Sequence, residues 1–286
     1  MNALISRNLR VYFRDKASVF FSLLSVMIII LLYALFLGDA WAGSSMFRGR
    51  EGVRWLMDAW IMAGLLAVVS VTSTMGAYGI MVEDRSRKII KDFYSSPLSR
   101  AGLTGGYILS AFVIGLVMSL LTAVLAVVYI LARGGQLPAL AALGKTFLLI
   151  LTSTLSNTAM VLFLISFIKS TNAFSTASTL IGTLIGFLTG IYMPIGQLPP
   201  AVQTLIKVIP TSHAAALFRQ TLMEQPIQLV FQGAPEEMVA EFKGAMGVTL
   251  SLGGHTFTAW EHVLVLAASF LLFSLLSLWS LSRKKN

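Results

Sequence analysis

The chain has 286 residues, of which 56% are hydrophobic and only 12% are charged, and its formal net charge is +9. Its mean hydropathy of +0.82 is too high for a soluble domain with a solvated surface, so water is not the main solvent of this protein. The absence of cysteine excludes disulfides, thiolate metal sites and thiol nucleophiles, and it fits a bacterial membrane.

Uncharged runs are the main feature of the sequence. A helix that crosses a bilayer needs about 20 mostly apolar residues, and six uncharged runs reach that length. They cover residues 17–38, 59–82, 101–132, 146–168, 170–206 and 262–282. A β-barrel would show short alternating strands instead. We therefore predict an all-α integral membrane protein with six transmembrane helices.

The distribution of basic residues predicts the orientation. Six spans place both termini on one side of the membrane, and basic residues gather on the cytoplasmic side. The segments 7–16, 85–91 and 283–285 are basic and would all lie together. Against this, the first outer loop carries three arginines between residues 48 and 54. We expect a multi-pass plasma-membrane protein with both termini in the cytoplasm.

The segment 1–16 is amphipathic. Its apolar arc comprises Ile5, Leu9, Tyr12 and Phe13, and its basic arc comprises Arg7, Arg10 and Arg14. This pattern predicts an interfacial helix whose arginines face anionic lipid, although a simple positive anchor is an equal alternative. The segment has no short apolar core with a cleavage site, so we expect the first run to remain in the mature protein.

The stretch 83–97, between the second and third runs, carries the highest density of charge. At helical spacing its apolar face comprises Ile89, Ile90, Phe93 and Tyr94, and its polar face comprises Asp84, Arg85, Arg87, Lys88, Lys91 and Asp92. Pro97 should end this helix. We favour a docking helix for a cytosolic partner, while packing on lipid or on neighbouring spans is the alternative.

The fifth run is too long for one span and is interrupted by prolines, namely Pro194, Pro199, Pro200 and Pro210. The span should end near Tyr192, and a short helix should follow. Thr211 and Ser212 could cap a second one. We predict a re-entrant hairpin over 194–223 that enters from the outer face, because broken backbone at membrane depth must be buried in protein or line a cavity. Two interfacial helices are the alternative.

The outer segment 224–261 has mixed character. A helix is expected to begin near Pro235, where Glu236 and Glu237 follow the proline. Gly253 and Gly254 predict a turn. The segment contains no motif that indicates a function.

Residues for catalysis or ion coupling are missing from the runs. None of the six contains Asp, Glu, Lys or Arg, on which ion-driven carriers commonly depend. The histidines, His213, His255 and His262, have no carboxylate at metal-ligand spacing. The Lys145 region resembles the end of a phosphate-binding loop but lacks its first glycine, where Ala139 stands. We predict no catalytic residue, metal or cofactor in this chain.

Two sets of local sequence, in the charged loop and in the predicted hairpin, stand out. The loop strings are Glu83-Asp84-Arg85 and Tyr94-Ser95-Ser96-Pro97-Leu98-Ser99-Arg100; the hairpin strings are Gly190-Ile191-Tyr192-Met193-Pro194-Ile195-Gly196-Gln197-Leu198-Pro199-Pro200, Ile209-Pro210-Thr211 and Leu217-Phe218-Arg219. Together with the arrangement of the spans, these strings resemble the ABC-2 type family of exporter permeases. The resemblance covers nearly the whole chain, and the hairpin is its most specific part. The outer segment is longer than expected of a minimal member.

The resemblance implies one ABC-2 transmembrane domain over 1–286 that exports its substrate with energy from a separate chain. Two permeases, identical or related, would associate with two cytosolic ATPases, which hold ATP and Mg²⁺. The implied contacts with the ATPase are Glu83, Asp84, Arg85, Ile89, Ile90, Phe93, Tyr94 and Pro97. Members export drugs, as in multidrug resistance, or lipids, glycolipids, polysaccharides or peptides. A pathway without fixed charge favours an amphipathic or lipophilic substrate.

Two other classes fit a six-span chain. A secondary carrier or channel would transport without ATP. A membrane-embedded enzyme would need a buried acid-base pair, and the spans offer serine and threonine without a base.

Overall fold

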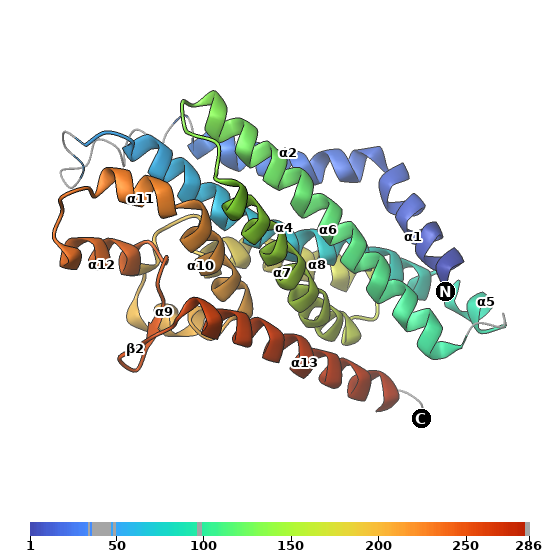
Figure 1. The fold of residues 1–286 in the computed structure, drawn as a ribbon. Helices are drawn as coiled ribbons and strands as arrows, with labels where there is room; N and C mark the ends of the chain where they lie inside the picture. Colours follow the sequence, from blue (N-terminus) through green and yellow to red (C-terminus); the bar gives the residue numbers. More distant parts are fainter. Residues whose placement is uncertain (34, 36–46, 48–49, 96–98, 284–286) are drawn as a thin grey trace.

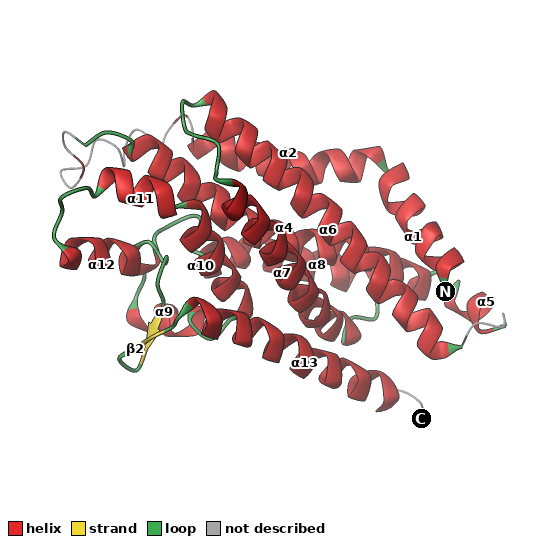
Figure 2. Ribbon diagram, in the orientation of Figure 1, coloured by secondary structure: helices red, strands yellow, loops and turns green. Residues whose placement is uncertain are grey.

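The computed structural model describes residues 1–33, 35, 47, 50–95 and 99–283. The chain is mostly helical, and its only strands in this described part form one small antiparallel hairpin, β1 (Ser251–Leu252) with β2 (His255–Thr256) (Figure 2). Gly253 and Gly254 form its turn with positive φ angles, as the sequence predicts.

Among the residues that the structure describes, four helices are long and apolar enough to cross a membrane. They are α4 (Val53–Ser86), α6 (Arg100–Ala132), α7 (Leu140–Ser166) and α13 (Ala259–Arg283). The central helix is α4, which packs against α6, α7, α8 and α10 and is largely buried. The other three helices expose leucine and valine side chains on their outer faces, which suits contact with lipid. The fold class, an all-α membrane protein, is confirmed at this level.

The first and fifth predicted spans correspond to shorter helices. Helix α2 (Lys16–Leu32) has 17 residues, and residues 34 and 36–38 of its run lie outside the described residues. Helix α8 (Thr171–Leu188) has 18 residues and ends before Tyr192, where the span was expected to end. Its first half is rich in Ser, Thr and Asn, which lowers its hydropathy.

Short helices follow α8, as the prolines predict. After a 3-10 turn, η3 (Ile195–Gln197), come α9 (Pro200–Ile206) and α10 (Pro210–Leu222), each with a proline in its first turn. Beyond them lie α11 (Glu224–Val230) and α12 (Glu236–Ala245), and the latter begins directly after Pro235 as expected. Proline fixes φ and needs no intrahelical donor at these positions, so it starts each helix.

The predicted cap of α10 is wrong. The helix begins at Pro210, and no side chain caps it. Thr211 and Ser212 lie inside the first turn, where both hydroxyls instead bind other parts of the bundle. Their partners are the Asn157 side chain and the Leu188 carbonyl.

The prediction of one helix over 83–97 is also wrong in part. Helix α4 continues to Ser86, the chain turns, and α5 covers only Ile90–Tyr94. Lys88 has a φ of 63° at this turn, a left-handed conformation that a helix cannot contain. Pro97, expected to end the helix, lies outside the described residues.

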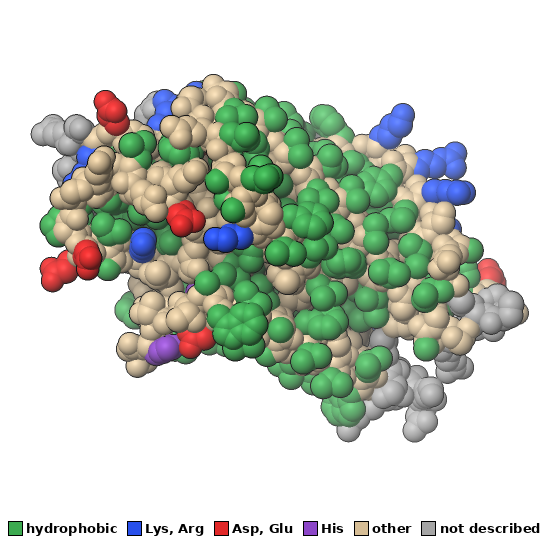
Figure 3. All heavy atoms as spheres, in the orientation of Figure 1, with side chains coloured by type: hydrophobic (Ala, Val, Ile, Leu, Met, Phe, Trp, Pro, Cys, Tyr) green, Lys and Arg blue, Asp and Glu red, His purple; other side chains and the backbone are tan. Residues whose placement is uncertain are grey.

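The bundle has two distinct ends. The start of α1 (Asn2–Arg14), helix α5 and the last turns of α13 lie at one end, whereas α9, α11, α12 and β2 lie at the other (Figure 1). Charged side chains gather towards these ends on the face shown in Figure 3, and a broad uncharged region separates them. Such a belt matches the hydrocarbon layer of a bilayer.

Candidate functional site

A buried carboxylate lies at the end of the bundle that carries the termini. Asp84, in the last turn of α4, is only 2% exposed. The Tyr107 hydroxyl of α6 donates to its Oδ2 at 2.6 Å, and Arg7 Nη2 of α1 donates to its Oδ1 at 2.8 Å. Arg7 Nη1 completes a bidentate pair with Asp84. One carboxylate therefore joins three helices.

Arg7 also contacts the short helix α5. Its guanidinium carbon lies 5.8 Å from the centroid of the Phe93 ring of α5, a cation-π contact. The hydrogen bond to Asp84 raises the pKa of Arg7 above its ordinary value, so Arg7 stays charged. We name Arg7, Asp84, Phe93 and Tyr107 the Arg7 cluster. It fastens α1, α4, α5 and α6 to one another.

The face of α1 that packs on the bundle differs from the predicted apolar arc. Its buried residues are Leu4, Asn8 and Tyr12, and Asn8 Nδ2 donates to Ser110 Oγ of α6 at 3.2 Å. The approach to α6 is close, because a Cβ on Gly106 would lie 2.6 Å from Leu4 Cδ2. Helix α1 is thus docked on protein along one side, and Arg7 belongs to that side.

The predicted contacts with the ATPase divide into two groups. Asp84 is buried, contrary to its predicted place on the polar face. The prediction considered the loop by itself, whereas Arg7 of α1 pairs with Asp84 in the fold. Ile90 and Phe93 are partly buried and pack against the core. Arg85 donates to the Ile168 carbonyl at 3.2 Å. These residues hold the loop to the bundle.

The remaining loop residues face outwards. Glu83 and Arg87 form an exposed ion pair at 2.7 Å. Ile89 is half-buried, the side chain of Tyr94 lies outside the described residues, and Lys88, Lys91 and Asp92 are exposed. This exposed side of the turn and of α5 is the part of the loop that is open to another chain.

A second arginine lies buried near the opposite end. Arg219 of α10 is 0% exposed, and its Nη2 donates to the carbonyls of Thr189 (2.8 Å) and Gly190 (3.3 Å). These carbonyls follow the last turn of α8, where the helix dipole is negative. Its guanidinium carbon lies 5.1 Å from the centroid of the Trp60 ring. The charge is thus balanced by a helix end and an aromatic face.

The backbone at Met246 and Gly247 also packs against Arg219 and Trp60. Arg219 Nη1 also approaches the Gly247 carbonyl at 3.5 Å, and Trp60 Nε1 donates to the Met246 carbonyl at 2.8 Å. Gly247 has a φ of +67°, and a Cβ there would lie 2.9 Å from Arg219 Nη1. We name Trp60, Thr189, Gly190, Arg219 and Gly247 the Arg219 cluster. It fastens α4, α8 and the segment that follows α12 to α10.

Helix α10 is buried among α4, α7 and α13. The Thr211 hydroxyl donates to Asn157 Oδ1 at 3.0 Å, and Asn157 Nδ2 donates to Ser70 Oγ at 2.6 Å. This chain of hydrogen bonds links α10 to α7 and α4. Short helices can sit at membrane depth only if their polar groups are satisfied by protein in this way.

The four predicted hairpin prolines all stand at helix starts or turns. Pro194 precedes η3, Pro199 and Pro200 open α9, and Pro210 opens α10. The structure brings Arg219, the fifth predicted hairpin residue, into a cluster of its own. Sequence reasoning named Arg219 but gave it no partner.

Two histidines that looked scattered in the sequence meet in the structure. The Nδ1 atoms of His213 (α10) and His262 (α13) lie 2.7 Å apart, and His213 Nε2 lies 2.9 Å from the Lys207 carbonyl. A carbonyl accepts only, so with both rings neutral His213 carries its proton on Nε2 and His262 donates from Nδ1. No spacing rule could have found this pair, because the two residues are 49 positions apart.

The described residues hold no group of three or more His, Cys, Asp or Glu that could hold a metal ion. What they hold is a central membrane helix to which two arginine clusters fasten shorter helices, one at each end. This arrangement defines a helical membrane protein.

The comparison with protein families is consistent with that class. The ABC-2 type transporter family model matches residues 1–223, so the chain belongs to this family and the predicted resemblance is confirmed. The match ends one residue after α10 and includes both named arginines. No curated protein matches the sequence.

Proposed function

We propose that this chain is the permease subunit of an ABC exporter that moves an amphipathic or lipophilic substrate outwards. ATP is hydrolysed by a separate ATPase subunit, and a second permease completes the pathway. The family assignment supports the permease class. The Arg7 cluster is the observation that best supports coupling to ATP hydrolysis. It connects the loop that would contact the ATPase to the helices of the bundle.

In this proposal the chain has six spans, with α2 and α8 added to the four long helices. Both termini then face the cytoplasm, in agreement with their place at one end of the bundle (Figure 1). Helices α9 and α10 form the re-entrant hairpin. The support for the hairpin is the burial of α10 and the satisfaction of its side chains by α4, α7 and α8.

The exposed face of α8 supports a pathway at that helix. Six polar side chains are exposed there, namely Thr171, Asn172, Ser175, Thr176, Thr179 and Thr183. The exposed residues of α6 and α13 are by contrast largely leucine and valine. A polar face on a membrane helix favours contact with a second subunit or with a water-filled path over contact with lipid. The face has no charge, which suits an amphipathic substrate.

Coupling would use both sides of the loop. The exposed side of α5 and of the turn before it contacts the ATPase, while Ile90 and Phe93 hold α5 against the bundle. A displacement of α5 is then passed through Phe93 and Arg7 to Asp84 at the end of α4. Because Ile90 and Phe93 pack against the bundle, we do not expect every apolar residue of the loop to insert into the ATPase.

The test compares two substitutions of acidic residues by their amides in the reconstituted complex of both permeases and ATPases. Asp84→Asn removes the charge that holds Arg7, whereas Glu237→Gln changes an exposed residue of α12 at the opposite end of the bundle. We expect Asp84→Asn to lower the amount of substrate moved per ATP hydrolysed about fivefold or more, since removing one partner of a buried charge pair costs far more than removing an exposed charge. Glu237→Gln should leave this ratio unchanged.

Equal effects of the two substitutions would contradict the coupling role of the Arg7 cluster. Transport that continues without ATP would contradict the exporter itself and favour the secondary carrier or channel.

A further inference from the structure

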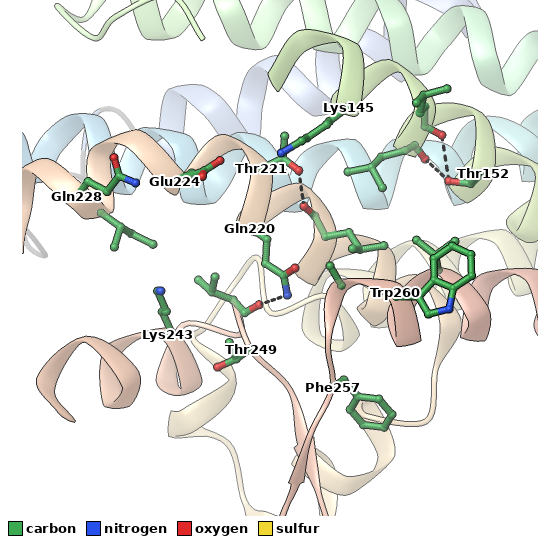
Figure 4. A pocket seen from close by; sticks show the side chains of 17 residues that line it. Lys145, Thr152, Gln220, Thr221, Glu224, Gln228, Lys243, Thr249, Phe257 and Trp260 are labelled. Carbon is green, nitrogen blue, oxygen red and sulfur yellow. Dashed lines mark hydrogen bonds between the residues drawn. The ribbon is translucent and has the colours of Figure 1, made fainter. Parts of the chain in front are cut away.

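A pocket of about 960 Å³ opens between α7, α10, α11, α12 and α13 (Figure 4). It lies at the end of the bundle opposite the termini, away from the Arg7 cluster and from the exposed face of α8. Its size is within the range of about 300 to 1,000 Å³ that is typical of ligand sites. Neither the family nor the proposed coupling assigns it a role.

One side of the pocket is apolar. Leu148 of α7 and Trp260 and Val263 of α13 line it, and the first two are 61% and 67% exposed. Trp260 stands in the first turn of α13, and Val263 lies one turn further into the membrane. Tryptophan near the start of a span marks the interface between water and hydrocarbon. The pocket therefore straddles that interface.

The other side of the pocket is charged. Lys145 of α7, Glu224 of α11 and Lys243 of α12 line it, and Figure 4 shows all three on the side away from Trp260. No ion pair joins any of them to another described residue. Two ammonium groups and one carboxylate leave the pocket with a net charge of +1. Lys145 lies one turn before Leu148, so charge and apolar surface adjoin on the same helix.

We propose that this pocket binds one anionic phospholipid from the adjacent leaflet. Its phosphate would lie between Lys145 and Lys243, and the hydroxyl groups of a glycerol headgroup would donate to Glu224. The first part of an acyl chain would cover Leu148, Trp260 and Val263. The net charge of +1 matches a headgroup of charge −1 and not a zwitterionic one. The apolar side would stay uncovered around free phosphate.

The test uses the full-length chain in nanodiscs that contain equal amounts of phosphatidylglycerol and phosphatidylcholine. Native mass spectrometry then counts the lipids that stay bound after release. We expect the chain to retain phosphatidylglycerol in preference. Lys145→Gln and Lys243→Gln should each weaken that retention about fivefold or more, because each removes a charged hydrogen bond to phosphate. Lys207→Gln, at the same end but outside the pocket, is the matched control.

A fourth substitution separates lipid from free phosphate. Val263→Trp fills the apolar side and keeps every charge, so it should abolish lipid retention. The proposal is overturned if the lysine variants retain phosphatidylglycerol as the unmodified chain does, or if phosphatidylcholine is retained equally. It is also overturned if Val263→Trp leaves retention unchanged, or if millimolar inorganic phosphate displaces the lipid. The assay needs no ATPase, so its result is independent of the proposed export function.

Discussion

Arg7→Ala should release α1 from the bundle, whereas Arg10→Ala on the same helix should not. Arg7 makes two hydrogen bonds to a buried carboxylate, and such charged bonds are worth about 1.5 to 3 kcal/mol each. Its side chain is 35% exposed, so we discount the pair to about 2 to 3 kcal/mol in total because solvent screens it. At about 1.4 kcal/mol for each factor of ten, local opening becomes about 30 to 150 times more frequent.

Hydrogen exchange of the amides in 2–14 measures this opening directly, since exchange reports local unfolding. Arg10 is exposed, and its replacement changes helix propensity and net charge by the same amount as that of Arg7. We expect exchange in α1 to accelerate strongly for Arg7→Ala and less than about twofold for Arg10→Ala. Similar acceleration in both variants would show that Asp84 does not hold α1 and would refute the argument.

Three further predictions concern other parts of the chain. Gly247→Ala should cost about 2 to 4 kcal/mol of stability in thermal unfolding in detergent, because a Cβ there strains the backbone and contacts Arg219. Gly233→Ala, with a φ of +72° in open space, should cost only the strain of about 1 kcal/mol. A cysteine at exposed Glu224 should react with an impermeant reagent added outside, and one at exposed Asp92 with reagent added to the cytoplasmic side. The purified chain alone should hydrolyse no ATP.

Each of these predictions has a contrary result. Equal losses at Gly247 and Gly233 would mean that the Arg219 cluster tolerates a methyl group. Labelling of Glu224→Cys from the cytoplasmic side only would overturn the topology, and hydrolysis by the chain alone would overturn the division between permease and ATPase. Gly196 also belongs to the predicted hairpin, but a cysteine there is a poor label for topology because its Cβ would lie 2.8 Å from Ala245 Cα.

The elements that could be predicted are those that local chemistry determines. Long uncharged runs locate α4, α6, α7 and α13, and Pro200, Pro210 and Pro235 mark where three short helices begin. The lengths are less predictable. Helix α4 continues past Glu83, because charged residues are compatible with a helix, so the end of an uncharged run does not mark the end of the helix.

The site residues that could not be predicted depend on partners distant in the sequence. Helical periodicity assigns Asp84 to a solvated face, but Arg7, 77 residues away, provides a charge that makes burial favourable. Thr211 suits an N-cap by residue type, yet Asn157 offers a better partner once α7 lies beside it. The left-handed Lys88 carries no local signal, since such a conformation is usual for glycine.

Helix α4 has 34 residues, which gives a rod about 51 Å long, well beyond the hydrocarbon layer of about 30 Å. Trp60 and Asp84 belong to this one helix and are separated by 24 residues, or about 36 Å along the axis. If the end beside Trp60 serves as the pivot, a tilt of about 5° moves Asp84 sideways by about 3 Å. A small displacement of the loop would then tilt α4 across the whole thickness of the membrane.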